Sequence, residues 1–315
     1  VNVSSGVFSM VGHYLWTGVS AAAGGVGVVG SEVGENINSI NAHLAMARGA
    51  ARQFSVPFTM DFSAWMAGFI LDYSKEQFWG AASSPVGGHS LSLFKRTYMS
   101  AFAAGAGSII AEAGAVNFFL DPLPNASAPL PLSSLGAIGA AFYSYTHGGV
   151  PAPAIVDAEL VRGVPYVPIA LVVPTALGMG IGWWYNSLAW DVLPYQRSDV
   201  VTRLWLETVW PNSWLVMNEF NGPASESHYL VASPFGEVFD LLLDSALGGV
   251  PAPQRGNGAH DAPTPADLLA AYRVVVVAGL GAEITPSLCA ALDAFVVHSN
   301  GTVWLTAADV TAAPS

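Results

Sequence analysis

Charged residues are scarce in this sequence, at 10% of its 315 residues, and basic residues are the rarer kind. Ten Lys and Arg stand against 22 Asp and Glu, which gives a formal net charge of −12. Nucleic acids and anionic membrane surfaces are bound through clustered Lys and Arg. The composition therefore argues against both as partners of this chain.

Cysteine and uninterrupted apolar runs are also lacking. The single cysteine, Cys289, excludes an internal disulfide, and the helical pattern "TPSLCAALDAF" around it predicts a small apolar side chain buried on a helix. The chain is 52% hydrophobic with a mean hydropathy of +0.47, yet an apolar stretch such as "VPYVPIALVVPTALGMGIGWW" is broken by three prolines. This pattern suits a buried strand and a loop, so we expect no membrane span.

Acceptor motifs for N-glycosylation are present in three places. Asn2, Asn125 and Asn300 each begin an Asn-x-Ser/Thr sequence in turn-like surroundings. Such motifs are modified in secreted proteins. We therefore expect a secreted glycoprotein, either extracellular or at the cell surface.

Strand and helix patterns alternate through residues 1–150. Apolar runs predict strands near residues 26–32, 57–62 and 108–113. Apolar residues at helical spacing predict helices in the segments 10–25, 37–54, 89–107 and 131–149, and residues 67–88 are expected to form a long loop. Strands that alternate with helices of ordinary length predict a parallel sheet with crossover helices.

A Pro-rich linker at residues 151–164 precedes a second alternating unit at 165–315. The segments "YVPIALVV", "YRVVVVAG" and "GTVWLTAA" predict adjacent parallel strands. Helices are predicted in "SDVVTRLWLETVWP" with Ser198 as cap, in "SPFGEVFDLLLDSA", and after Thr285 with Pro286 at the first position. The segment "AGLGAE" lacks the full dinucleotide fingerprint and the P-loop lysine, so neither a cofactor nor a metal is predicted.

Carboxylates follow three successive predicted strands of the first unit. Glu32 and Glu35 follow the first, Asp61 the second and Glu112 the third. The carboxyl ends of parallel strands face the ligand crevice of such folds. Two carboxylates across a cleft are what glycosidic hydrolysis requires, because one protonates the leaving oxygen and the other attacks the sugar carbon or activates water. The expected substrate-binding residues are Asn36, Trp65, His89 and Asn117.

A structural role for these acids is the competing interpretation. A carboxylate at a strand end often caps the next helix or pairs with an arginine. Glu35 is placed to cap the helix of residues 37–54, whose Arg48 and Arg52 are potential ion-pair partners. His43 lies inside the same helix, where we expect a structural role.

Whole segments of the chain resemble a known enzyme family. The segments "GSEVGENINSINAHLAMARGAARQFSVPFTMDFSAW", "GHSLSLFKRTYMSAFAAGAGSIIAEAG" and "RGVPYVPIALVV" resemble the C-terminal part of glycoside-hydrolase-type (β/α)8 barrels. The second half, with "YRVVVVAG" and "ITPSLCAALDAFVVHSNGTVWLTAADV", is similar to the flavodoxin-like, class I glutamine-amidotransferase-like domain that follows the barrel in trimeric bacterial β-galactosidases. The resemblance implies an α/β fold with a partial TIM-type barrel and then a doubly wound domain.

The sequence departs from this family at two points. The turn after "VVVVAG" carries Leu280 and Gly281 where the amidotransferase has its cysteine, so the second domain is expected to be non-catalytic. Only about three barrel strands precede residue 150, whereas a closed barrel needs eight. The chain is then either part of a longer polypeptide, which we expect, or a relative that has lost half of the barrel.

Two functions follow from these patterns. The first is a glycoside hydrolase that acts on an extracellular glycan through paired carboxylates. The second is a non-catalytic glycan-binding or structural component of an extracellular matrix or cell-surface filament, built on the same scaffold. Both functions imply carbohydrate as a partner. Both also allow contacts with other protein chains, in a homo-oligomer or in a larger extracellular assembly.

Overall fold

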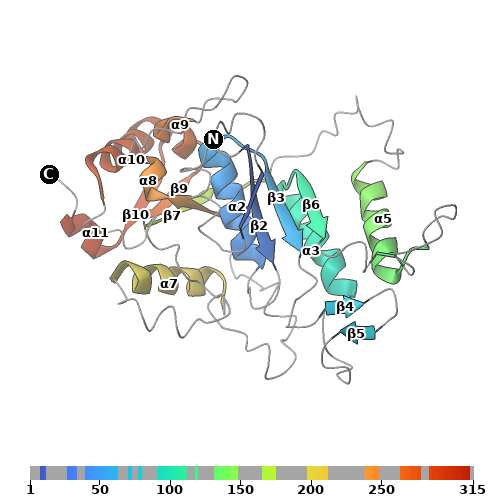
Figure 1. The fold of residues 1–315 in the computed structure, drawn as a ribbon. Helices are drawn as coiled ribbons and strands as arrows, with labels where there is room; N and C mark the ends of the chain where they lie inside the picture. The colour runs from blue at the N-terminus through green and yellow to red at the C-terminus, as the bar shows by residue number, and fades with distance from the viewer. Residues whose placement is uncertain are drawn as a thin grey trace, which may run out of the picture.

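The computed structural model describes residues 8–11, 27–33, 40–62, 70–72, 77–79, 91–111, 118–119, 131–147, 165–174, 197–211, 238–247, 263–277 and 284–312. Within these residues the chain is an α/β protein built on two parallel four-stranded sheets (Figure 1). The predicted α/β class is therefore confirmed. The predicted linker at 151–164 lies outside the described residues.

The first sheet follows the order of the chain. Its strands are β1 (Phe8–Val11), β2 (Val28–Val33), β3 (Phe58–Phe62) and β6 (Ser108–Ala111), and each is parallel to the next. The sequence-based prediction that the strands near 26–32, 57–62 and 108–113 are parallel neighbours is thus confirmed. Since every step goes to the adjacent position, the sheet is wound in one direction only.

Helices cover one face of this first sheet. Val29, Phe58 and Met60 point into a core shared with α2 (Ile40–Phe54) and α3 (Leu91–Ala104). A further helix, α5 (Ser134–Thr146), packs against α3 and begins at Ser133, whose side chain accepts a hydrogen bond from the Gly136 amide. Such an N-cap satisfies one of the amides that a helix start leaves unpaired.

The second sheet reverses direction after its first strand. Its spatial order is β10 (Thr302–Leu305), β9 (Val274–Val277), β7 (Ile169–Val173) and β8 (Phe239–Leu243). If the four strands are numbered 1 to 4 along the chain, their spatial order from β8 to β10 is therefore 2-1-3-4. The predicted adjacency of "YVPIALVV", "YRVVVVAG" and "GTVWLTAA" is confirmed, because β7 pairs with β9 and β9 pairs with β10, all in parallel.

Both faces of the second sheet are covered. Odd-numbered residues of β7 and β8 pack with α7 (Arg197–Val209), and even-numbered ones pack with α10 (Pro286–Ser299). The predicted cap of α10 is confirmed, since the Thr285 side chain accepts from the Leu288 amide at 3.1 Å. The remaining helices are α8 (Asp244–Leu247), α9 (Pro265–Leu269) and α11 (Ala307–Ala312). None of the helices in the described ranges has both the length and the apolar composition needed to cross a bilayer.

Helix α2 belongs to both sheets, and 13 of its 15 residues are buried. One side packs on β2 and β3, and the other lies along β8, the edge strand of the second sheet. Figure 1 shows α2 between the two groups of strands. The approach is closest at Gly49, where an added Cβ would lie 1.9 Å from the Leu241 carbonyl oxygen. A glycine at this position is what lets the helix backbone reach the strand backbone.

One predicted helix is wrong, and another is contradicted at its first two residues. The segment "SPFGEVFDLLLDSA" contains the strand β8 followed by the short α8. All five residues of β8 are buried, so its apolar run has the uniform pattern of a covered parallel strand. In the predicted helix 10–25, Met10 and Val11 belong to β1, and residues 12–26 lie outside the described ranges.

Three smaller expectations also differ from the structure. The expected loop 67–88 contains an antiparallel hairpin of β4 (Ile70–Asp72) and β5 (Gln77–Trp79). Helix α7 begins at Arg197, so Ser198 is its second residue and not the residue before its start. Cys289 is only partly buried, at the border of the core formed by α10 and the second sheet.

We predict that Gly49→Ala lowers the free energy of unfolding by about 1–3 kcal/mol, because the new methyl group overpacks against the β8 backbone. In an ordinary helix interior the same change is stabilising by about 1 kcal/mol. The matched control is Gly139→Ala on α5, where an added Cβ meets the Phe118 ring at 3.7 Å, an ordinary contact. Urea unfolding of both variants measures the contrast, and equal effects at the two glycines would contradict the close approach.

Candidate functional site

Two carboxylates lie opposite each other at the carboxyl ends of neighbouring strands. Glu32 of β2 is the register partner of Asp61 of β3, and Asp61 is in turn paired with Ile110 of β6. Register partners on parallel strands point to the same face of a sheet, and their strands lie about 4.8 Å apart. Glu32 and Asp61 therefore form a carboxylate pair on one face of the first sheet.

The carboxylate pair is on the face opposite to α2. Side chains alternate along a strand, and the neighbouring Ser31 points toward α2, where its Oγ lies 2.5 Å from Nδ1 of His43. Both Ser31 and His43 are fully buried, which agrees with the structural role expected for His43. The helix layer thus occupies one face, and the carboxylates point to the other.

Other polar groups share the face of the carboxylate pair. The Thr59 hydroxyl donates to the Ser108 carbonyl oxygen at 2.9 Å and accepts from the Ser108 hydroxyl at 2.7 Å. Asp61 is only 4% exposed, whereas Glu32 is half-buried. This face therefore carries two carboxylates and two hydroxyls, with Glu32 as the more accessible acid.

The negative charge of Asp61 also affects the pKa of a tyrosine on the helix side of the sheet. Burial raises the pKa of Tyr98 on α3 well above its usual range, and the negative charge of Asp61 raises it further. The Tyr98 phenol consequently stays protonated at every physiological pH. Asp61 thus sits where a neighbouring phenol senses its charge.

Most of the other predicted site residues cannot be placed beside this pair. Asn300 is described and lies exposed at the C-cap of α10. The predicted site residues that lie outside the described ranges are Asn2, Glu35, Asn36, Trp65, His89, Glu112, Asn117 and Asn125. Of the four predicted catalytic acids, the structure therefore describes Glu32 and Asp61 and brings these two together.

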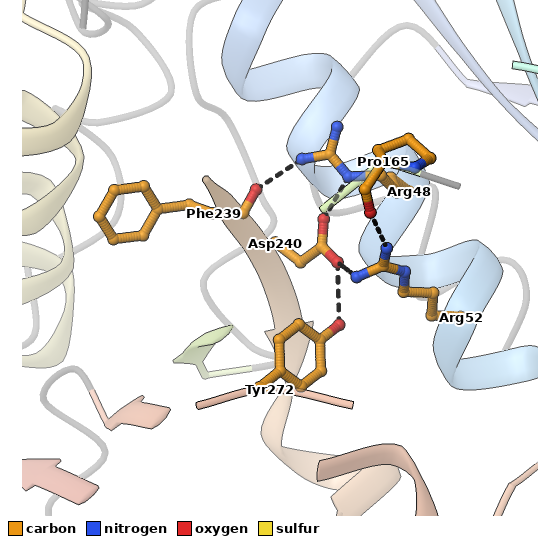
Figure 2. Close-up of polar contacts among 6 residues, drawn as sticks. All are labelled: Arg48, Arg52, Pro165, Phe239, Asp240 and Tyr272. Carbon is orange, nitrogen blue, oxygen red and sulfur yellow. Dashed lines mark hydrogen bonds and ion pairs between the residues drawn. The ribbon is translucent and has the colours of Figure 1, made fainter. Parts of the chain in front are cut away.

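A second polar cluster lies where α2 meets β8, and we call it the Asp240 network (Figure 2). Asp240 is fully buried and accepts from Nε of Arg48 at 2.5 Å, from Nη1 of Arg52 at 2.6 Å and from the Tyr272 hydroxyl at 2.9 Å. Arg48 also donates to the Phe239 carbonyl oxygen at 2.7 Å. Arg52 donates to the Pro165 carbonyl oxygen at 3.2 Å.

The network has a structural role, because its acid is sealed from solvent and its members join segments about 190 residues apart in the sequence. Burial lowers the pKa of Arg52, but the charge of Asp240 and the contact with Tyr272 outweigh this and raise it overall. The Arg52 guanidinium also lies 5.7 Å from the centre of the Tyr272 ring. Within the described residues, Arg48 and Arg52 thus form their ion pairs with Asp240 on β8.

Sequence reasoning missed Asp240. Its signal was a single acid inside the apolar run "VFDLLL", where an ionised side chain needs a buried cation. The two arginines one helical turn apart in "ARGAARQF" carried the complementary signal.

We predict that Asp240→Asn lowers the free energy of unfolding by about 3–5 kcal/mol, because it leaves the buried Arg48 without its counter-charge. The control is Asp293→Asn on the exposed side of α10, for which a change within about 0.5 kcal/mol is expected. Both are measured by urea unfolding. A loss below about 1 kcal/mol in Asp240→Asn would show that the network does not hold α2 against β8.

Alkaline stability offers a second test. Burial, reinforced by the charge of Asp240, raises the pKa of Tyr272 above its usual range, as burial and Asp61 do for Tyr98. Below about pH 10 both phenols are protonated in the folded and unfolded chain, and above it the unfolded chain loses protons that the folded chain retains. The free energy of unfolding is therefore expected to fall as pH rises above about 10.

The measurement is urea unfolding at a series of alkaline pH values, with the exposed Tyr145→Phe as control. Tyr98→Phe should flatten the pH dependence, and Tyr145→Phe should leave it unchanged. An identical slope in all three proteins would show that the buried phenol is not the source.

Comparison with known proteins adds no relative to this geometry. A scan against protein-family models and searches of curated proteins and solved structures found no match. Within the described residues, no group of three or more His, Cys, Asp or Glu side chains is arranged to hold a metal ion. The carboxylate pair of Glu32 and Asp61 is the acidic arrangement that the described residues offer for chemistry.

Proposed function

We propose that this chain is a carbohydrate-active protein, a glycoside hydrolase that acts through paired carboxylates. The observation that carries the proposal is the register pairing of Glu32 with Asp61 at the carboxyl ends of adjacent parallel strands. Carboxyl ends of parallel strands are where α/β enzymes assemble their sites. One acid protonates the leaving oxygen, and the other attacks the anomeric carbon.

The spacing of the pair favours a retaining mechanism. Register partners on adjacent strands start about 4.8 Å apart at the backbone. This is close to the carboxyl separation of about 5 Å in retaining glycosidases, whereas inverting enzymes need about 6.5–9.5 Å for a water molecule between the two acids. Glu112 follows Ala111 at the end of β6, the strand next to β3. Glu112 and Glu35 are the third and fourth acids of the proposed site.

The topology of the first sheet supports the barrel part of the proposal. Its strands run in chain order with α2 and α3 packed on the same face, which is the winding of a (β/α) barrel. The opposite face, which would line the barrel, carries Glu32, Thr59 and Asp61. We accordingly propose that the first sheet is a portion of a glycosidase-like barrel.

The topology of the second sheet supports a flavodoxin-like domain. The order 2-1-3-4 matches the first four positions of the flavodoxin-like order 2-1-3-4-5. Helices cover both of its faces, as in doubly wound folds. We propose that this domain is non-catalytic and that it supports the first sheet through α2.

The proposed setting is outside the cell, with the chain as part of a homo-oligomer or a larger extracellular assembly. Asn300 supports it, because this residue begins the motif Asn300-Gly301-Thr302 and is exposed at the end of α10. An exposed acceptor is accessible to glycosylation. Asn2 and Asn125 are the other proposed acceptors.

We predict that Glu32→Gln and Asp61→Asn each lower glycosidase turnover at least about a hundredfold, because each removes one member of the acid pair. The assay is release of nitrophenolate from a panel of 4-nitrophenyl glycosides. Glu112→Gln is measured beside them, and Asp293→Asn is the control expected to retain full activity. Nuclear magnetic resonance of the first-formed sugar should show retention at the anomeric carbon.

Three outcomes decide between the functions. Inversion at the anomeric carbon would assign catalysis to acids other than Glu32 and Asp61. Absence of hydrolysis, combined with calorimetric binding of oligosaccharides that Glu32→Gln weakens, would favour the non-catalytic glycan-binding protein. Full activity in both Glu32→Gln and Asp61→Asn would refute the proposed site.

A further inference from the structure

A second candidate site lies on the helix-covered side of the first sheet. A hollow of about 570 Å³, here called the aromatic pocket, opens between α3, β6 and α5. This volume is within the usual range for small-molecule sites. Ile109 and Ala111 of β6 line the pocket. They are the register partners of Met60 and Phe62, which face the helices. The pocket is therefore on the opposite side of the sheet from the carboxylate pair.

Aromatic rings form a large part of the walls. Tyr98 and Phe142 lie 5.4 Å apart between ring centres, and Phe102 meets Phe142 edge-on at 6.0 Å. Tyr143 and His147 are stacked at 4.1 Å with an angle of 23° between their planes, and both line the pocket. Flat faces and ring edges arranged in this way suit a flat ring as ligand.

One buried polar group in the pocket lacks a partner. The Tyr98 side chain is 3% exposed, and its hydroxyl has no hydrogen-bond partner among the described residues. The raised pKa keeps this phenol protonated, so it is a donor. A buried donor without an acceptor is destabilising, and a ligand oxygen or nitrogen within reach would remove that cost.

The other described lining groups argue against a charged ligand and against a sugar. The described lining residues include no Lys, Arg, Asp or Glu, so these residues offer an ionic ligand no acidic or basic counter-charge of those four types. The Ser108 hydroxyl proton is used by Thr59, and the Thr146 hydroxyl donates to the Tyr143 carbonyl oxygen. A sugar ring, with several hydroxyls to satisfy, is therefore matched poorly by this lining.

We propose that the aromatic pocket binds an uncharged aromatic molecule that carries one hydrogen-bond acceptor, which accepts a hydrogen bond from the Tyr98 hydroxyl. The aromatic walls hold the ring, and Tyr98 fixes its orientation. This binding activity is independent of the proposed glycosidase site, because it uses the opposite face of the sheet and none of the carboxylates.

The test uses 6-propionyl-2-(dimethylamino)naphthalene, an uncharged fluorescent ring system with one ketone oxygen. Its emission strengthens in apolar sites and moves to longer wavelength when the ketone accepts a hydrogen bond. The expected result is saturable binding of one molecule per chain to the unmodified protein.

Two variants locate the probe. Tyr98→Phe keeps the ring and removes the donor, so affinity should fall about five- to tenfold and the bound emission should move to shorter wavelength. Gly139→Leu adds a side chain next to Phe118 in the pocket wall and should abolish binding. Tyr145→Phe, on the exposed side of α5 and outside the described pocket lining, is the control expected to bind like the unmodified protein.

The folded state of each variant is checked by circular dichroism. If Gly139→Leu does not fold, the affinity and emission of Tyr98→Phe decide the question. The proposal is overturned if the unmodified protein shows no saturable binding. It is equally overturned if Tyr98→Phe binds with unchanged affinity and emission, or if a folded Gly139→Leu binds as well as the unmodified protein.

Discussion

The covering of the β8 edge by α2 is the constraint on which both sheets depend. An edge strand presents unpaired amide and carbonyl groups, which proteins protect from mispairing by covering them. Here the Gln53 carboxamide accepts from the Leu243 amide and donates to the Leu243 carbonyl oxygen, both at 3.0 Å, in the manner of another strand. Arg48 donates a hydrogen bond to the Phe239 carbonyl oxygen. Gly49 allows the backbone of α2 to approach the backbone of β8 at Leu241. Because the other side of α2 carries the first sheet, losing this contact would loosen both.

Much of the fold was readable in the sequence, since local chemistry and position along the chain agreed. Thr285 followed by Pro286 marked the start of α10 because a hydroxyl cap and a preset backbone angle both favour a helix there. The run "YRVVVVAG" gave β9 because β-branched residues in a short apolar run suit a strand that is covered on both faces. The proximity of Glu32 and Asp61 followed from the rule that successive parallel strands end at the same edge.

What the sequence did not show depended on distant partners. The run "FDLLL" is too short for periodicity to separate a buried strand from a helix, and only the neighbours β7 and α2 make it a strand. Asp240 was missed for the same reason, because Arg48 and Arg52 are far from it in sequence. The aromatic pocket required the packing of α5 beside α3, which no local pattern encodes.

The distance along the chain between α2 and β8 also bears on how the protein is made. The Gln53 carboxamide can form its hydrogen bonds with Leu243 only after 190 further residues have been synthesised. At about 5–20 residues per second, a ribosome needs on the order of 10–40 s to add that stretch. During this interval the nascent first sheet carries a helix whose arginines and glutamine face no strand. The covering of this side of α2 is thus delayed until β8 has been synthesised, and a folding helper that shields α2 would act during that interval.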